Sequence, residues 1–247
     1  MKVIVYGADG VMGRQLKAQI DCRPEVETVA EVTPLVSNGL TCLAEFKGES
    51  DGVIDFSHPS NLSDIIQWGE KTGKAILLCT TGYSDYDYDI ISRGAKSCPI
   101  LVAGNTSLGV NIVKIILEQM VSLLGDWDIE LIEKHHNRKK DSPSGTAREL
   151  LQILENNNVN TTQPVYGRGL GEYKRKQGDI GIHAIRGGTI TGEHSILFAG
   201  YDEIIELKHQ ALSRRIFVNG ALKAAQWLIQ QPAGCYSMRD IFNSKNS

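Results

Sequence analysis

The chain has 247 residues and a formal charge of −3 at pH 7. Hydrophobic residues make up 41% and charged residues 22%, a globular mix that excludes collagen, a coiled coil and general disorder. The charge provides no basic field for nucleic acid, and no apolar run is long enough to predict a membrane span. The five cysteines are scattered and show no C-x-x-C pair, which argues against a disulfide framework or a zinc ribbon and favours a reducing, cytoplasmic location.

In the first hundred residues, short β-branched runs alternate with helical patterns. This alternation predicts right-handed βαβ units and a parallel sheet. In such sheets ligands bind beyond the carboxyl ends of the strands, so the loops at 7–13, 57–59, 80–82 and 104–107 are expected along one edge. The expected strands are 2–6, 26–32, 53–56, 75–79 and 100–103, and the expected helices are 13–20, 61–71 and 86–96.

The pattern changes after about Asn105. Longer strands and tight turns predict an antiparallel or mixed sheet, joined to a few helices in a second domain. An open sheet in a small domain leaves an exposed face, which often becomes a subunit interface. The expected helices are 110–124, 144–154 and 217–229, the expected strands are 128–134, 179–186, 193–199 and 203–210, and 156–177 is expected to form long loops.

A glycine-rich turn at 7–13 has the spacing G-x-x-G-x-x-G, directly after the first strand. Glycines let the backbone turn tightly and let a pyrophosphate approach main-chain amides, while the helix start contributes partial positive charge. The sequence therefore predicts a dinucleotide site, the alternative being a strand-to-helix turn without a ligand. Glu31 is the candidate acidic residue at the end of the second strand.

The segment 133–141 is the densest chemical cluster in the chain. Histidine is the natural proton donor near pH 7, and lysine adds a positive charge. A metal site formed by Glu133, His135 and His136 is disfavoured, because strand alternation places His136 on the opposite face from the other two. A solvated basic loop is the remaining alternative. The other histidines, His58, His183, His194 and His209, are interpreted as structural or surface residues.

The next segment, 141–147, predicts a helix start with Ser144 as its N-cap. Gly145 and Thr146 would offer exposed amides and a hydroxyl there. A helix start flanked by histidines and lysines suits a small carboxylate or phosphate. Ordinary capping without a ligand is the alternative.

These motifs resemble those of the 4-hydroxy-tetrahydrodipicolinate reductase (dihydrodipicolinate reductase) family over nearly the whole chain. The run E-x-H-H-x-x-K-x-D-x-P-S-G-T-A is the most specific of them. The matching segments are 7–14 (GADGVMGR), 55–57 (DFS), 80–82 (TTG), 104–111 (GNTSLGVN), 133–147 (EKHHNRKKDSPSGTA), 182–199 (IHAIRGGTITGEHSILFA) and 208–221 (KHQALSRRIFVNGA).

The resemblance implies an α/β fold: a Rossmann-like parallel-sheet domain, residues 1–104 completed by 213–247, and an α+β domain with an open mixed sheet, residues 105–212. The first would bind NADH or NADPH, and the second would bind a small dicarboxylate substrate and assemble a homotetramer. The implied reaction is reduction of 4-hydroxy-tetrahydrodipicolinate to tetrahydrodipicolinate, with loss of water, in lysine and diaminopimelate biosynthesis.

The resemblance also assigns roles by motif position. His135 would donate the proton, and Lys139 would bind the substrate and share the acid role. Other substrate contacts would come from His136, Ser144, Gly145 and Thr146. The implied cofactor contacts are Gly7, Ala8, Asp9, Gly10, Val11, Met12, Cys79, Thr80, Thr81, Ala103, Gly104, Asn105, Thr106 and Arg214.

Four places depart from the family's usual pattern. Val11 replaces a frequent basic residue, Cys79 replaces a glycine, and Thr106 replaces an aromatic residue. Positions 33–34 (Thr-Pro) show neither an acidic partner for a ribose hydroxyl nor a basic one for a 2′-phosphate, which leaves NADH and NADPH as alternatives. A diverged cofactor-binding paralogue and a reductase of another small carboxylate are the alternative functions.

Overall fold

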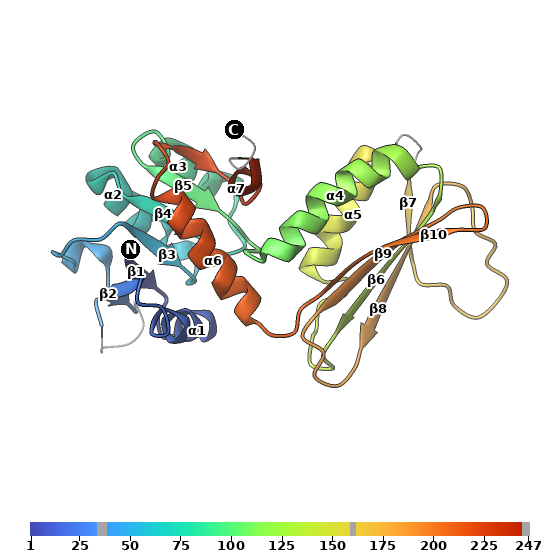
Figure 1. The fold of residues 1–247 in the computed structure, drawn as a ribbon, viewed down its shortest axis with the longest axis horizontal. Coiled ribbons are helices and arrows are strands. Elements are labelled where there is room, and N and C mark those ends of the chain that lie inside the picture. Colours follow the sequence, from blue (N-terminus) through green and yellow to red (C-terminus); the bar gives the residue numbers. More distant parts are fainter. Residues whose placement is uncertain (34–38, 159–161, 244–247) are drawn as a thin grey trace. The chain divides into compact units, whose positions relative to one another are not determined.

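The computed structural model describes residues 1–33, 39–158 and 162–243 and divides into two compact units (Figure 1). Unit 1 comprises Met1–Leu108 and Arg215–Ser247, and unit 2 comprises Gly109–Arg214. The divisions fall within four residues of those expected at 104/105 and 212/213. None of the helices in the described ranges combines the length and hydrophobicity that a membrane crossing requires.

Unit 1 is built on a six-stranded sheet in which every strand pair is parallel, in the order β11-β5-β4-β3-β1-β2. The five strands expected from the sequence are present. The sixth, β11, was not expected, because its three residues carry no periodic pattern and become a strand by pairing with β5. The strands are β1 (Lys2–Tyr6), β2 (Glu27–Val32), β3 (Gly52–Asp55), β4 (Ala75–Leu78), β5 (Pro99–Val102) and β11 (Gly234–Tyr236).

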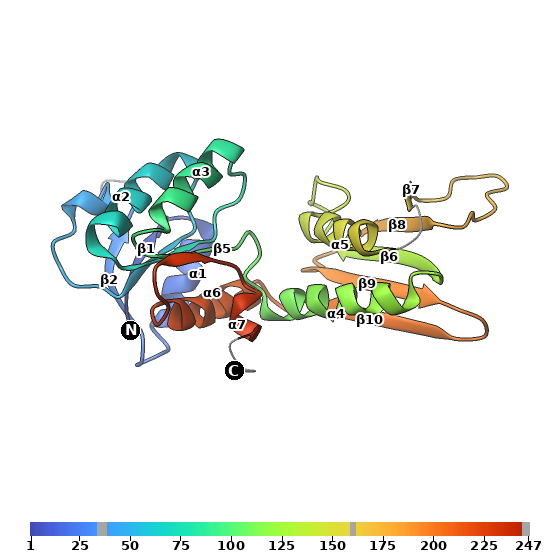
Figure 2. The same ribbon diagram turned by 90° about the horizontal axis from the view of Figure 1, so that it is seen from above.

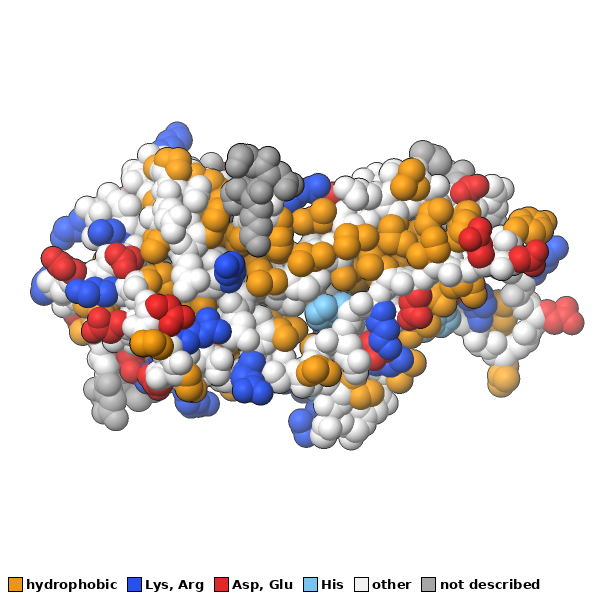
Figure 3. All heavy atoms as spheres, in the orientation of Figure 1, with side chains coloured by type: hydrophobic (Ala, Val, Ile, Leu, Met, Phe, Trp, Pro, Cys, Tyr) orange, Lys and Arg blue, Asp and Glu red, His pale blue; other side chains and the backbone are white. Residues whose placement is uncertain are grey.

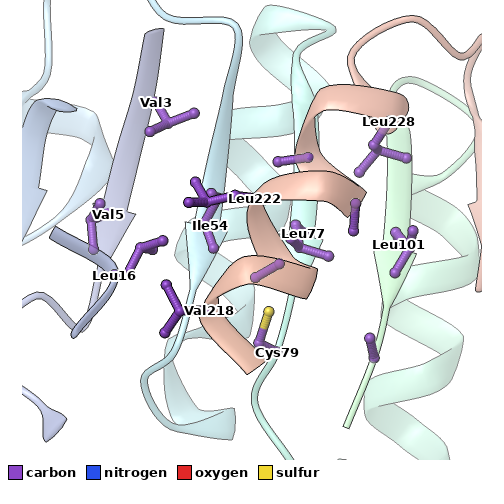
Figure 4. Packing of buried hydrophobic residues seen from close by; sticks show 14 of the residues in the cluster. Val3, Val5, Leu16, Ile54, Leu77, Cys79, Leu101, Val218, Leu222 and Leu228 are labelled. Atoms are coloured by element: carbon purple, nitrogen blue, oxygen red, sulfur yellow. The ribbon is translucent and has the colours of Figure 1, made fainter. Parts of the chain in front are cut away.

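Helices cover both faces of this sheet (Figure 2). Because successive side chains of a strand alternate, Val5 belongs to the core that includes residues of α1 and α6, while Ile4 belongs to the core that includes residues of α2 and α3. Figure 4 shows α6 crossing the first of these faces, with Val218 and Leu222 in the core. The helices are α1 (Val11–Ile20), α2 (Leu62–Thr72), α3 (Asp85–Gly94), α6 (Arg215–Leu228), α7 (Asp240–Asn243) and the short 3-10 turns η1 (Leu43–Glu45) and η2 (Pro59–Asn61).

Unit 2 contains a five-stranded mixed sheet in the order β10-β9-β6-β8-β7. Strands β6, β7 and β8 run parallel to one another, and β9 is antiparallel to both of its neighbours, β6 and β10. Strand β7 lies inside the region expected to be loops, because a short edge strand with a proline gives no sequence signal. The elements are α4 (Leu108–Leu124), β6 (Asp128–His135), α5 (Gly145–Asn157), β7 (Gln163–Tyr166), β8 (Asp179–Arg186), β9 (Glu193–Ala199) and β10 (Ile204–Gln210).

Helices α4 and α5 cover one face of this second sheet, and their apolar residues pack on Leu131 and Phe198. The outer surface of α4 stays apolar: Ile112 is 42% exposed and Leu123 is 79% exposed. Figure 3 shows hydrophobic side chains gathered on the face of unit 2 that carries α4. No helix in the described ranges packs on the opposite face, which we call the open face.

Glu130 lies on the open face and anchors the loop between β7 and β8. Its carboxylate accepts hydrogen bonds from Arg168 Nη2 at 2.9 Å and from His183 Nε2 at 2.7 Å, and it also pairs with Arg175. Gly181 sits opposite Glu130 in the β6–β8 register, where a Cβ atom would collide with the Glu130 carboxylate. The glycine therefore makes room for this cluster.

Candidate active site

The loops expected along one edge of the parallel sheet meet there. The loop after β1 touches the loop after β3, since a Cβ on Gly7 would lie 2.8 Å from the Phe56 carbonyl oxygen. The loop after β4 touches the loop after β5, since a Cβ on Gly104 would lie 3.3 Å from Thr81 Cγ2. The family resemblance assigned cofactor contacts to the loops after β1, β4 and β5, and the strand order β5-β4-β3-β1 places these loops and the loop after β3 along one edge.

The glycine turn leaves a helix start with free amides. Gly7 has a φ of +78°, a conformation that glycine tolerates and other residues rarely adopt. Gly10 is the N-cap of α1, and neither a side-chain cap nor an acidic residue occupies the first turn. Val11 is 53% exposed there. The local geometry is that of an anion-binding helix N-terminus.

A buried carboxylate fixes the next two loops. Asp55, at the end of β3, is fully buried and accepts hydrogen bonds from the Ser57 amide at 3.0 Å and from the Tyr83 hydroxyl at 3.3 Å. Burial raises the pKa of Asp55, and hydrogen bonds from the Ser57 amide and hydroxyl oppose that rise. Asp55 thus joins the loop after β3 to the loop after β4.

Three of the predicted cofactor contacts differ in how far their side chains are buried. The Cys79 side chain is buried in the core beneath α6, near Val218, so only its backbone faces the loops (Figure 4). Thr106 is 2% exposed, and its hydroxyl donates to the Phe217 carbonyl oxygen at 2.6 Å. Arg214 is exposed in the turn before α6, as the last residue of unit 2.

The acidic candidate at the end of β2 is engaged elsewhere. Glu31 Oε1 lies 2.6 Å from Lys17 Nζ on α1, so the carboxylate braces that helix against β2. Thr33 is buried at 6% exposure, and Pro34 lies outside the described residues.

In unit 2, the end of β6 carries the predicted proton donor. His135 Nδ1 lies 2.6 Å from Glu133 Oε2, and the His135 side chain is 12% exposed. The pKa of His135 is lowered, first by burial and then by the charges of Lys139 and Arg186, while Glu133 opposes the shift. Glu133 and His135 pair with each other, and the described residues contain no group of side chains arranged to hold a metal ion.

The neighbouring residues complete the basic cluster. Lys139 Nζ pairs with Asp141 Oδ1 at 2.8 Å. The Lys139 amide donates to the His136 carbonyl oxygen at 3.1 Å, which forms a tight turn. The His136 Nδ1 atom is buried without a hydrogen-bond partner among the described residues. Such a buried polar atom favours a ligand or a water at this place.

The start of α5 follows the prediction closely. Ser144 is its N-cap, and the hydroxyl accepts from the Ala147 amide at 3.2 Å. The same hydroxyl lies 3.0 Å from His194 Nε2, and Ser144 is 2% exposed, so its side chain is already committed within the protein. Gly145 is different, because a Cβ there would meet no atom within 4 Å. Space is therefore open beside Gly145.

Two residues of this site escaped the sequence interpretation. His194, interpreted as structural or surface, is 5% exposed and packs edge-on against His135 at 5.3 Å between ring centroids. Burial lowers the pKa of His194 to about 4. Arg186 donates to both Glu133 oxygens, at 2.8 and 2.7 Å. The missing signal was strand register, which sets His194 opposite Glu133 and Arg186 opposite His135.

The fold is typical of one class of protein, the two-domain oxidoreductases that combine a nucleotide-type parallel sheet with a second, mixed-sheet unit. Residues 1–106 match the model "Dihydrodipicolinate reductase, N-terminus", and residues 109–242 match "Dihydrodipicolinate reductase, C-terminus". The chain belongs to the dihydrodipicolinate reductase family. It is an oxidoreductase of lysine and diaminopimelate biosynthesis, a 4-hydroxy-tetrahydrodipicolinate reductase by family.

Named relatives agree with this assignment. A 4-hydroxy-tetrahydrodipicolinate reductase of Exiguobacterium sibiricum is 45% identical over 205 residues, covering 83% of this chain and 82% of the relative. One from Clostridium tetani is 39% identical over 250 residues, covering 99% and 98%. A solved structure, a dipicolinate-bound dihydrodipicolinate reductase from Paenisporosarcina sp. TG-14, is similar in fold, with a TM-score of 0.79 at 19% identity over 96% of this chain and 97% of that one.

Proposed function

We propose that this chain reduces 4-hydroxy-tetrahydrodipicolinate with a reduced nicotinamide dinucleotide, NADH or NADPH, and that His135 donates the proton that accompanies the reduction. The observation that carries this proposal is the pairing of His135 with Glu133 at 2.6 Å, beside an open, anion-binding helix start. The dinucleotide, when bound, supplies the hydride. The residues of the chain orient the substrate, stabilise the charge that develops on it and donate the proton.

The glycine turn of unit 1 fits a dinucleotide. A Cβ on Gly13 would lie 2.1 Å from the Gly7 carbonyl oxygen, so the first turn of α1 packs directly on the loop. Helix α1 begins at Val11 and has no side-chain cap, so the amides of its first turn are available to a ligand. A pyrophosphate bound there would gain main-chain hydrogen bonds and the favourable end of the helix dipole. Gly7 to Met12, the backbone of 79–81 and residues 103–106 would form the binding edge.

The substrate diacid is proposed to bind at the start of α5. The amides of Gly145 and Thr146 would hold one carboxylate, with His136 and Lys139 adding polar and positive groups. The absence of an acidic residue from the first turn of α5 favours an anion at this position. The Paenisporosarcina relative described as dipicolinate-bound supports a planar diacid as the ligand class.

The test is an assay of cofactor oxidation with purified protein. Substrate is generated in situ, and NADH and NADPH are compared side by side. We expect substrate-dependent oxidation and competition by pyridine-2,6-dicarboxylate. Cofactor binding without substrate-dependent oxidation would identify a diverged binding protein. Turnover of another carboxylate without competition by the pyridine diacid would identify a different reductase.

Replacing Lys139 with alanine is expected to raise KM for the diacid by about 10- to 100-fold and to lower kcat, because a charge-assisted contact worth about 1.5–3 kcal/mol is lost. Steady-state kinetics at saturating cofactor measure both constants. Lys140→Ala is the matched control, since it removes the same charge from an exposed neighbour. An unchanged KM in Lys139→Ala would contradict the carboxylate contact.

The open face of the second sheet is proposed to join copies of the chain into a homotetramer. Ile185 is 45% exposed and Ile204 is 65% exposed at this sheet. A sheet face of this kind gains stability when a second copy covers it. Light scattering is expected to give four times the mass of one chain, and a mass of one or two chains would contradict the proposal. The cytoplasmic location expected from the cysteines stays a prediction.

A further inference from the structure

Glu133 stands out as a fully buried carboxylate with three kinds of partner. Both oxygens accept from Arg186 of β8, at 2.8 and 2.7 Å. Oε1 also accepts from the Ser144 amide at 3.0 Å, and Oε2 faces His135 Nδ1 at 2.6 Å. One carboxylate therefore connects β6, β8, the N-cap of α5 and the proposed proton donor.

The charge of Glu133 follows from these partners. Burial raises its pKa, but the hydrogen bonds from Arg186, His135 and the Ser144 amide outweigh burial and lower it overall. Glu133 is therefore ionised at neutral pH, and an ionised carboxylate can only accept hydrogen bonds. The hydrogen between Glu133 and His135 consequently belongs to Nδ1.

This bond decides which nitrogen of His135 can exchange a proton. With Nδ1 protonated and held by Glu133, only Nε2 is left to gain and release the catalytic proton. Gly192 borders that nitrogen, since a Cβ on Gly192 would lie 3.2 Å from Nε2. The glycine leaves Nε2 approachable, and a side chain at this position would crowd it.

The remaining charged and titratable groups around His135 do not take over this role. His194 of β9 packs against the ring and is neutral at pH 7, because burial lowers its pKa to about 4. His209 of β10 faces His194 across the β9–β10 pair, and burial lowers its pKa too. Lys139 and Arg186 are cations that disfavour protonation of His135. Glu133 is the group that favours it.

We propose that Glu133 is a positioning residue of this enzyme: it fixes His135 as the Nδ1–H tautomer and ties the proton donor to the helix start that binds the substrate. The proposal rests on the proposed role of His135. Because the Ser144 amide and His135 Nδ1 share one carboxylate, the proton donor and the carboxylate site keep a set spacing. Carboxylates that orient metal-binding histidines contribute about 10- to 100-fold in affinity or activity, and we take the same range for this pair.

The test is Glu133→Gln, which keeps the size of the side chain and removes its charge. We expect kcat to fall by about 10- to 100-fold with little change in KM. His135 acts as an acid only when protonated, so activity falls as pH rises through its pKa. Without the nearby negative charge His135 holds its proton less tightly, and the midpoint of this fall is expected to move to lower pH. Glu133→Asp, which keeps the charge, is expected to restore part of the activity.

Nitrogen NMR of labelled histidine gives a readout that needs no substrate. Wild-type His135 is expected to show the Nδ1–H tautomer when neutral, and Glu133→Gln is expected to show a mixture. A wild-type Nε2–H tautomer would overturn the proposal even if Glu133→Gln did not fold. If the wild type failed to turn over 4-hydroxy-tetrahydrodipicolinate, the proposed function would fail while the tautomer result still decided the role of Glu133.

Glu130→Gln is the matched structural control. Glu130 also accepts from arginine and histidine, but on the open face, three residues away on the same strand. We expect it to lower the melting temperature to a degree similar to Glu133→Gln while leaving the pH midpoint and the His135 tautomer unchanged. Glu133→Gln could instead lower the melting temperature and leave both the pH midpoint of activity and the His135 tautomer as in the wild type. Glu133 would then be a structural residue only.

Discussion

His135→Gln is expected to lower kcat by about two to four orders of magnitude while the protein stays folded and binds cofactor, because the variant has no group that can deliver a proton at that position. The pKa of His135 is lowered chiefly by burial, with Lys139 and Arg186 adding to the effect. In the wild type, activity is therefore expected to rise as pH is lowered from 8 toward 6, and this dependence is expected to disappear in the variant. Stopped-flow cofactor oxidation across that pH range measures both effects.

His183→Gln is the control for this substitution. His183 is also a histidine paired with a glutamate of β6, at 2.7 Å from Glu130, and a glutamine can still donate that hydrogen bond. Its turnover is expected to stay within about a factor of three of the wild type, since the substitution preserves the contact. Wild-type turnover in His135→Gln would remove His135 from the mechanism.

The second large effect is expected from Gly13→Val. Any Cβ at this position would lie 2.1 Å from the Gly7 carbonyl oxygen and 2.8 Å from Ala8 Cα, and both neighbours are backbone atoms that cannot turn aside. Forcing a side chain into such a packed place costs about 3 kcal/mol or more. For a chain of this size the melting temperature is expected to fall by about 6–12 °C. Cofactor affinity, measured by fluorescence titration, is expected to fall with it, because the displaced loop is the proposed pyrophosphate site.

Ala18→Val provides the comparison on the same helix. Ala18 is exposed, so the substitution costs only the lower helix propensity of valine, about 0.5 kcal/mol. A Gly13→Val protein with wild-type melting temperature and cofactor affinity would show that α1 does not pack on the loop as described.

The sequence predicted those parts of the fold whose signal is local. Continuous apolar runs located β1 and β4, and Ser144 marked the start of α5 because its hydroxyl caps the helix where a serine usually does. Strands β7 (QPVY) and β11 (GCY) were not predicted, because neither contains a continuous apolar run like those of the four-residue strands in the first sheet. Strand β7 is extended because it pairs with β8, which lies beyond a long loop. Strand β11 is extended because it pairs with β5, which lies far away in the sequence.

The residues of the candidate site also fall into those with a local sequence signal and those without one. Alternation along β6 already placed Glu133 and His135 on one face, and the structure turns that relation into a hydrogen bond. Arg186 and His194 reach the same place only through the registers of β8 and β9, which no local pattern encodes. The Ser144 hydroxyl caps α5 as predicted, and its further contact with His194 again depends on the register of β9.

The chain connectivity of unit 1 affects how this unit folds during synthesis on the ribosome. Helix α6 covers one face of the parallel sheet and β11 forms its edge, although both come from the last part of the chain. When the ribosome has released only residues 1–108, the sheet lacks its edge strand and the apolar surface under α6 is open to water. Synthesis of unit 1 therefore begins first, but the unit is completed only after unit 2 has been synthesised. Its exposed apolar surface in the meantime is of the kind that chaperones bind.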